Sequence, residues 1–181
     1  ILCELFRASL AFGYIPQPWR ISRVVFIPKR GRASYSNARA FRPISLSSFL
    51  LKTLERLVEH HIRKGTLQGN PLHRKQHAYQ SGKSVESALH QLVSRIEDTL
   101  DRKEIALAAF LDIEGAFDRV TYESMVRAAR IRGIEPTCCR WINHMLRSRR
   151  IQSRILNVTQ EITATRGCPQ GGVLSPLLWS L

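Results

Sequence analysis

A carboxylate directly follows the most apolar stretch of the sequence. Residues 105–111, IALAAFL, carry no charge, and Asp112 comes immediately after them. Such a run is too short to span a membrane and favours a strand that is covered on both faces. A carboxylate at the end of a buried strand is costly unless a cation or hydrogen-bond donors meet it. Two partners for Asp112 therefore stay open: the first turn of the next helix, or a divalent cation such as Mg2+, which prefers oxygen ligands.

Three short segments occur in a fixed order along the chain: residues 41–46, FRPISL, residues 112–118, DIEGAFD, and residues 166–177, RGCPQGGVLSPL. Together they resemble the motifs of reverse transcriptases, in the order expected for that family. Residues 112–118, DIEGAFD, resemble the family's first catalytic motif, in the form found in retrotransposons that lack long terminal repeats. Residues 166–177, RGCPQGGVLSPL, resemble its glycine-rich motif, and residues 41–46, FRPISL, resemble a third. The resemblance extends from about Trp19 to the last residue and is nearest to the arthropod elements that insert at fixed genomic targets.

The resemblance implies an α+β fold. It would comprise the fingers and part of the palm of a right-hand polymerase, with helices packed on a small antiparallel sheet. Residues 1–104 would belong mainly to the fingers and residues 105–181 mainly to the palm, without a separable second domain. Because the chain begins at Ile1 rather than Met and stops in an apolar run, we expect a fragment that is incomplete at its C-terminus.

The resemblance also implies an RNA-directed DNA polymerase. The enzyme would join deoxynucleotides to a primer 3′-hydroxyl with two Mg2+ ions, or Mn2+ instead, that steady the attacking and leaving oxygens. Its partners would be an RNA template, a DNA primer or target and deoxynucleoside triphosphates. Synthesis at the target site implies a nuclear protein with a cytoplasmic ribonucleoprotein stage. The catalytic set would be incomplete here, since the adjacent aspartate pair that the family carries downstream does not occur in this sequence.

The family's site residues can be carried over to individual positions. Asp112 would be catalytic and would bind metal together with the backbone carbonyl of Ile113. Glu114 and Asp118 would be structural, or would contact the metal ligands rather than the metal. Phe117 would place a ring under the sugar of the nucleotide and leave no room for a 2′-hydroxyl; without the resemblance it is an ordinary core residue. The remaining nucleotide-binding positions would be Lys29, Arg42, Gly115, Ala116 and Gln170, and the template- or primer-binding positions would be Gln76, Gly171 and Gly172.

The charge of the chain independently favours a polyanionic partner. With 28 Lys and Arg against 14 Asp and Glu, the formal net charge is +14, which points to nucleic acid before a membrane surface. The four cysteines lack the paired spacing of a zinc site. The glycine that a P-loop requires before Gly82 is replaced by His77, which excludes that motif.

Periodicity and capping residues predict the elements that must position these residues. The expected helices are 3–12, 50–65, 84–100, 121–132, the stretch after Pro136, and one from Ser175. The expected strands are 19–28, 105–111, and a hairpin of 151–158 and 162–166 around 159–161. The helix that begins at Ser84 is expected to pack on the sheet.

Two other functions stay open. The first is a basic RNA-binding module that descends from a polymerase and no longer catalyses, which would explain the charge equally well. The second is a reverse transcriptase like those of group II intron maturases. Asp112, Phe117 and Gln170 favour an enzyme, because binding alone would not require them.

Overall fold

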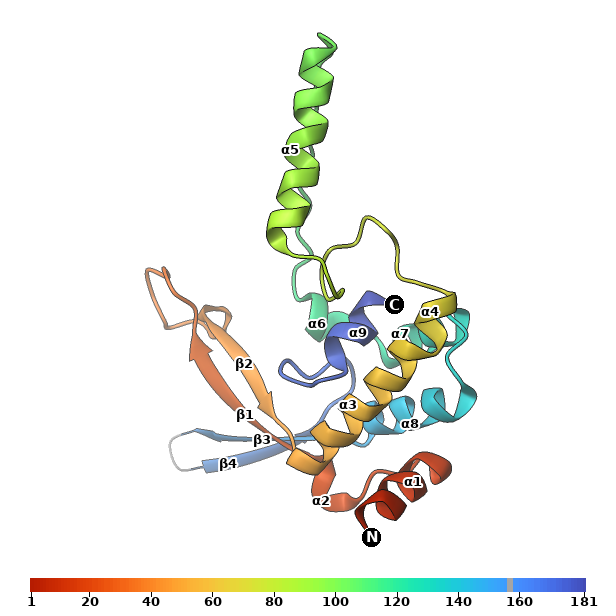
Figure 1. The fold of residues 1–181 in the computed structure, drawn as a ribbon. Helices are drawn as coiled ribbons and strands as arrows, with labels where there is room; N and C mark the ends of the chain where they lie inside the picture. The colour runs from red at the N-terminus through yellow and green to blue at the C-terminus, as the bar shows by residue number, and fades with distance from the viewer. Residues whose placement is uncertain (156–157) are drawn as a thin grey trace.

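A four-stranded sheet and a group of packed helices make up most of the fold (Figure 1), which is seen in a computed structural model that describes residues 1–155 and 158–181. The strands are β1 (Ile21–Pro28), β2 (Phe41–Leu46), β3 (Arg150–Ile155) and β4 (Val158–Thr163). The helices are α1 (Leu2–Phe12), α2 (Gln17–Arg20), the short η1 (Ala38–Ala40), α3 (Phe49–Lys64), α4 (Thr66–Gly69), α5 (Val85–Asp101), α6 (Ala116–Arg119), α7 (Tyr122–Ile131), α8 (Pro136–Arg147) and α9 (Ser175–Ser180). The predicted α+β class is confirmed.

The sheet is mixed rather than antiparallel. Its strand order is β2-β1-β3-β4, with antiparallel outer pairs and a parallel central pair in which Ile21 lies opposite Arg150. Hairpins join the outer pairs, whereas more than a hundred residues, most of them helical, separate β1 from β3. A long crossover connection of this kind permits parallel pairing. The predicted antiparallel sheet is therefore wrong for its central pair.

Several helix boundaries confirm the capping residues read from the sequence. Gly13 ends α1 in the left-handed conformation, with φ 61°. The side chain of Ser84 accepts a hydrogen bond from the Ser87 amide at the start of α5, and Thr121 accepts one from Ser124 at the start of α7. Because these side chains satisfy amides that have no partner within the helix, each fixes where its helix begins.

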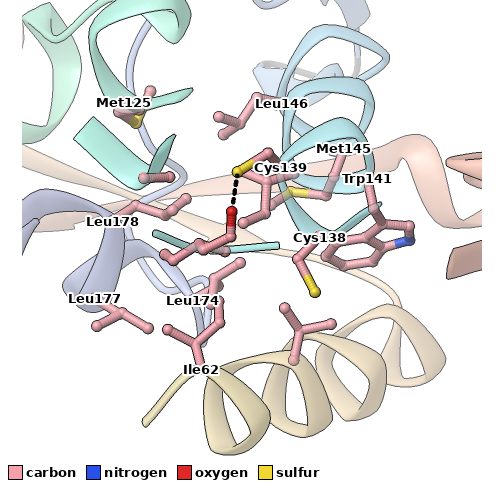
Figure 2. Close-up of a cluster of buried hydrophobic side chains, with 14 of the residues drawn as sticks. Ile62, Met125, Cys138, Cys139, Trp141, Met145, Leu146, Leu174, Leu177 and Leu178 are labelled. Carbon is pink, nitrogen blue, oxygen red and sulfur yellow. Dashed lines mark hydrogen bonds between the residues drawn. The ribbon is translucent and has the colours of Figure 1, made fainter. Parts of the chain in front are cut away.

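The core lies where α3, α7, α8 and α9 meet (Figure 2). Leu54 from α3, Trp141 and Leu146 from α8, and Leu177 from α9 have no exposed side-chain surface. The indole nitrogen of Trp141 donates to the Ser9 hydroxyl, 3.0 Å away, which fastens α1 to this core. Each fully buried side chain of this size contributes about 1.5–3 kcal/mol, so these helices form the rigid base for the segments described below.

The hairpin of β3 and β4 is confirmed, but its turn does not lie at the predicted residues. Residues 159–161, the expected turn, lie in β4 and pair with β3, with Glu161 opposite Gln152. The strand predicted over 151–158 includes residues 156 and 157, which lie outside the described residues. The polar residues 159–161 suggested a turn, but they lie in a strand whose residues are all exposed. An exposed strand can carry polar side chains as readily as a turn does.

Two predicted packing arrangements are wrong. Helix α5 projects away from the body of the molecule instead of packing on the sheet (Figure 1), and none of its residues is buried. Residues 105–111 form no strand, and Leu107 and Leu111 are 98% and 95% exposed. An extended segment becomes a strand only where a neighbour pairs with its backbone, and within residues 1–155 and 158–181 no strand pairs with this one.

Candidate active site

Backbone hydrogen bonds join the three segments that resemble polymerase motifs. The amide of Cys168, in the glycine-rich segment, donates to the carbonyl of Phe117 at 2.7 Å. The amide of Ser45, in β2, donates to the carbonyl of Gln170 at 2.7 Å. The glycine-rich segment therefore lies between residues 41–46 on one side and residues 112–118 on the other, although the sequence separates the three widely.

Two glycines allow this close approach. A Cβ on Gly167 would lie 2.9 Å from the carbonyl oxygens of both Phe117 and Asp118, and a Cβ on Gly171 would lie 3.0 Å from the carbonyl oxygen of Ser45. Both glycines also have positive φ, 79° and 104°. Since a side chain at either position meets backbone atoms, the packing of the motifs requires glycine there.

Aromatic rings flank Phe117. The Trp179 ring, on α9, lies 5.8 Å from the Phe117 ring at 34°, and the Tyr79 ring lies 6.5 Å away, edge to face. Tyr79 itself has a positive φ of 58°, which is uncommon for a bulky residue. Phe117 is half-buried and packs against the core, so its ring is held in place while part of it stays accessible.

Asp112 has an environment that suits a cation ligand. It is exposed, and within the described ranges its carboxylate has neither a hydrogen bond nor an ion pair. Hard cations take oxygen ligands of this kind, and the carbonyl of the adjacent Ile113 offers another. These residues fit as part of a two-ion site but cannot complete one, because two ions need more carboxylates.

The neighbouring carboxylate Glu114 is engaged with arginines instead. It lies 3.6 Å from Arg119 and 3.8 Å from Arg39, and all three side chains are mostly exposed. Exposed pairs of this type contribute little to stability. The contact with Arg39 nevertheless connects residues 112–118 to the loop between β1 and β2. Gly115, with φ 66°, and Ala116 form the start of the short helix α6.

The basic residues expected to hold phosphates lie at one end of the β1–β2 hairpin. The Lys29 amide donates to the carbonyl of Ala40 at 2.8 Å, and Arg42 lies opposite Ile27 in the sheet. Arg42 is exposed and Lys29 is half-buried, so both cations can reach an anion. Gln76 lies in the loop before α5, where its side chain donates to the carbonyl of Ala78. The same loop carries Tyr79 to Phe117.

Sequence reasoning missed two buried charged residues behind the glycine-rich segment. Glu55, 1% exposed, accepts from the amides of Val173 and Leu174 at 2.7 and 3.0 Å. Burial raises the pKa of the Glu55 carboxyl, and these amides, Lys52 and Arg149 partly offset that rise. Arg149, 8% exposed, donates to the carbonyls of Arg166 and Gly167 at 3.3 and 2.9 Å. The sequence could have indicated Glu55 as a buried carboxylate, since it lies on the apolar face of α3 among Leu51, Leu54 and Val58.

Comparison with known families identifies the chain. The family described as "Reverse transcriptase (RNA-dependent DNA polymerase)" matches residues 27–181, which include all three motif segments. The chain belongs to the reverse transcriptase family. The resemblance read from the motifs is thereby confirmed.

Relatives of this reverse transcriptase chain come from mobile elements. It is 30% identical over 182 residues to the "Probable RNA-directed DNA polymerase from transposon BS" of Drosophila melanogaster. The matched region covers 99% of this chain and 20% of that protein. It is 28% identical over 181 residues to the "RNA-directed DNA polymerase from mobile element jockey" of the same species, and this match covers 99% of this chain and 20% of the relative. It is 30% identical over 172 residues to the "Retrovirus-related Pol polyprotein from type-1 retrotransposable element R2" of Popillia japonica, and this match covers 93% of this chain and 23% of the relative.

The reverse transcriptase chain thus spans about a fifth of the length of these relatives. Reverse transcriptases generally depend on divalent metal ions, with which the free Asp112 carboxylate is compatible. Among the described helices, none combines the length and the apolar composition needed to cross a membrane.

Proposed function

We propose that residues 1–181 form the fingers and part of the palm of an RNA-directed DNA polymerase from a retrotransposon without long terminal repeats. Residues 1–104 belong mainly to the fingers, and residues 105–181 mainly to the palm. The observation that carries the proposal is the joining of the motif segments through two backbone hydrogen bonds, from Ser45 to Gln170 and from Cys168 to Phe117. Such an arrangement fixes residues of three separate segments in one place, as catalysis requires.

In this proposal each residue has a defined task. Asp112, with the carbonyl of Ile113, holds divalent ions, and Mg2+ is the preferred ion with Mn2+ as an alternative. When bound, the ions stabilise charge on the attacking and leaving oxygens. Lys29 and Arg42 attract the triphosphate, while Gly115 and Ala116 lie beside it with small side chains. The ring of Phe117, which packs beside Tyr79 and Trp179, excludes a 2′-hydroxyl.

The nucleic acids in this proposal are an RNA template and a DNA primer or target. Gln170, Gly171 and Gly172 face the nascent pair and the primer end, and Gln76 lies toward the template. The net charge of +14 supports contacts to phosphate along this surface. We further propose that the whole protein acts in the nucleus, where chromosomal DNA can serve as primer, after assembly with its RNA in the cytoplasm.

Primer extension tests this function. The substrates are an RNA template with an annealed DNA primer, the four deoxynucleotides, and Mg2+ or Mn2+. The full-length protein that carries this chain should extend the primer, whereas residues 1–181 alone should bind the RNA without extending it, because Asp112 supplies too few carboxylates for two ions. RNA binding without any synthesis by the full-length protein would favour a binding module instead.

A further inference from the structure

Two buried charges hold the ends of the loop that carries Gln170. This loop, residues 166–174, is called the glycine-rich loop below. At its start the guanidinium of Arg149 donates to the carbonyls of residues 166 and 167. At its end one carboxylate oxygen of Glu55 accepts from the amides of residues 173 and 174. Gln170 lies midway between these two anchors.

The anchors come from elements of the rigid core. Glu55 lies on α3 among buried apolar residues, and Arg149 lies two residues beyond the last residue of α8. Together with Pro169 of the loop they line a cavity of about 10 Å³, room for about one water molecule. Helices α3 and α8 thus determine where the glycine-rich loop lies, whereas the loop has no helix or strand of its own before α9.

Burial of these charges is hard to explain by stability alone. Ionic groups lose much hydration free energy when they are buried, and apolar residues of similar size often stabilise a fold as well or better. What apolar residues cannot supply is directed hydrogen bonding to four backbone groups of one loop. The loop contains two close backbone approaches, at Gly167 and Gly171, so a small displacement at either end would move Gln170 relative to Phe117.

We propose that Glu55 and Arg149 are positioning residues that hold Gln170 in the place where it contacts the incoming nucleotide. The inference rests on the proposed function and deepens it, because it assigns nucleotide affinity to side chains that do not touch the nucleotide. Glu55→Leu removes the acceptor for both amides, whereas Glu55→Gln keeps a carbonyl oxygen that can accept from them. Glu97→Leu, which replaces an exposed carboxylate on α5, is the matched control.

The test is steady-state primer extension by the full-length polymerase, with KM for deoxynucleotides and kcat measured separately. Glu55→Leu should raise KM by about tenfold or more while kcat per active site changes little, the pattern of lost binding. Glu55→Gln and Glu97→Leu should keep KM within about twofold of wild type. If Glu55 acts through Gln170, the double variant Glu55→Leu with Gln170→Ala should have no higher KM than Gln170→Ala alone.

Each remaining outcome also decides the question. An unchanged KM in Glu55→Leu, or KM effects that multiply in the double variant, would overturn the inference and leave the proposed function standing. Should Glu55→Leu fail to fold by circular dichroism, Arg149→Met takes its place and should raise KM likewise, because methionine fills a similar space but donates to neither the Arg166 nor the Gly167 carbonyl. No extension by the wild-type protein would refute the proposed function, and this inference with it.

Discussion

Replacement of Gly167 by alanine tests how the motif segments are joined. The new Cβ would lie 2.9 Å from two backbone carbonyl oxygens, those of Phe117 and Asp118, and neither is the end of a flexible side chain. To relieve this contact the glycine-rich loop must move away from residues 117–118. That movement lengthens two hydrogen bonds, from Gly167 to Val120 at 2.8 Å and from Cys168 to Phe117 at 2.7 Å.

Two effects contribute to the expected loss of folding free energy in Gly167→Ala. Alanine in a left-handed conformation costs roughly 1–2 kcal/mol, and two weakened hydrogen bonds cost about 1 kcal/mol each. Gly82→Ala is a control for the first effect, because Gly82 has a similar φ of 75° but a Cβ added there would meet no heavy atom within 4 Å. Gly167→Ala should therefore destabilise the chain by about 2 kcal/mol more than Gly82→Ala does.

Urea denaturation of residues 1–181, followed by tryptophan fluorescence, measures this difference. With a slope of about 2 kcal/mol per molar urea, the midpoint of Gly167→Ala should fall about 1 M below that of Gly82→Ala. Equal midpoints for the two variants would refute the reasoning, since they would mean that the glycine-rich loop does not press against residues 117–118.

Three other properties of the chain can be tested: nucleotide selection, RNA affinity and cysteine reactivity. Phe117→Val in the full-length polymerase should let ribonucleotides compete better with deoxynucleotides, because the change removes a clash; unchanged discrimination would make Phe117 a core residue only. The chain should bind RNA with an affinity that falls about 100-fold from 50 to 200 mM salt if about five phosphates are contacted, and a flat salt response would contradict the electrostatic interpretation. Burial raises the pKa of the Cys168 thiol to about 12 and also raises the pKa values of Cys138 and Cys139, so iodoacetamide at pH 8 should label the exposed Cys3 and leave the other three unmodified until the chain unfolds.

Local signals in the sequence predicted where several helices begin or end. Ser84, before an apolar periodic stretch, correctly predicted the start of α5, and Gly13, after an earlier such stretch, correctly predicted the end of α1. Both predictions succeed because capping depends on residues next to each other in the chain. The class of the fold and the family followed from three motifs whose order is preserved.

Packing was harder to predict because it depends on distant partners. The apolar run 105–111 has the composition of a buried strand, but burial requires a neighbouring strand or helix that composition does not reveal. Helix α5 was expected on the sheet for the same reason. The roles of Glu55 and Arg149 depend on amides and carbonyls of the glycine-rich loop, more than a hundred residues from Glu55 in the sequence. Only the position of Glu55 on an apolar helix face could have marked it.

Asp112 carries the catalytic assignment, and Asp112→Asn tests it in the full-length polymerase. The amide keeps the size of the side chain but lacks the charge that hard divalent cations require. Asp101→Asn, an exposed carboxylate at the end of α5, is the matched control. In Mg2+-dependent primer extension on an RNA template, Asp112→Asn should abolish synthesis while RNA binding stays near that of wild type, and Asp101→Asn should synthesise normally. DNA synthesis by Asp112→Asn at close to the wild-type rate would contradict the assignment of this site.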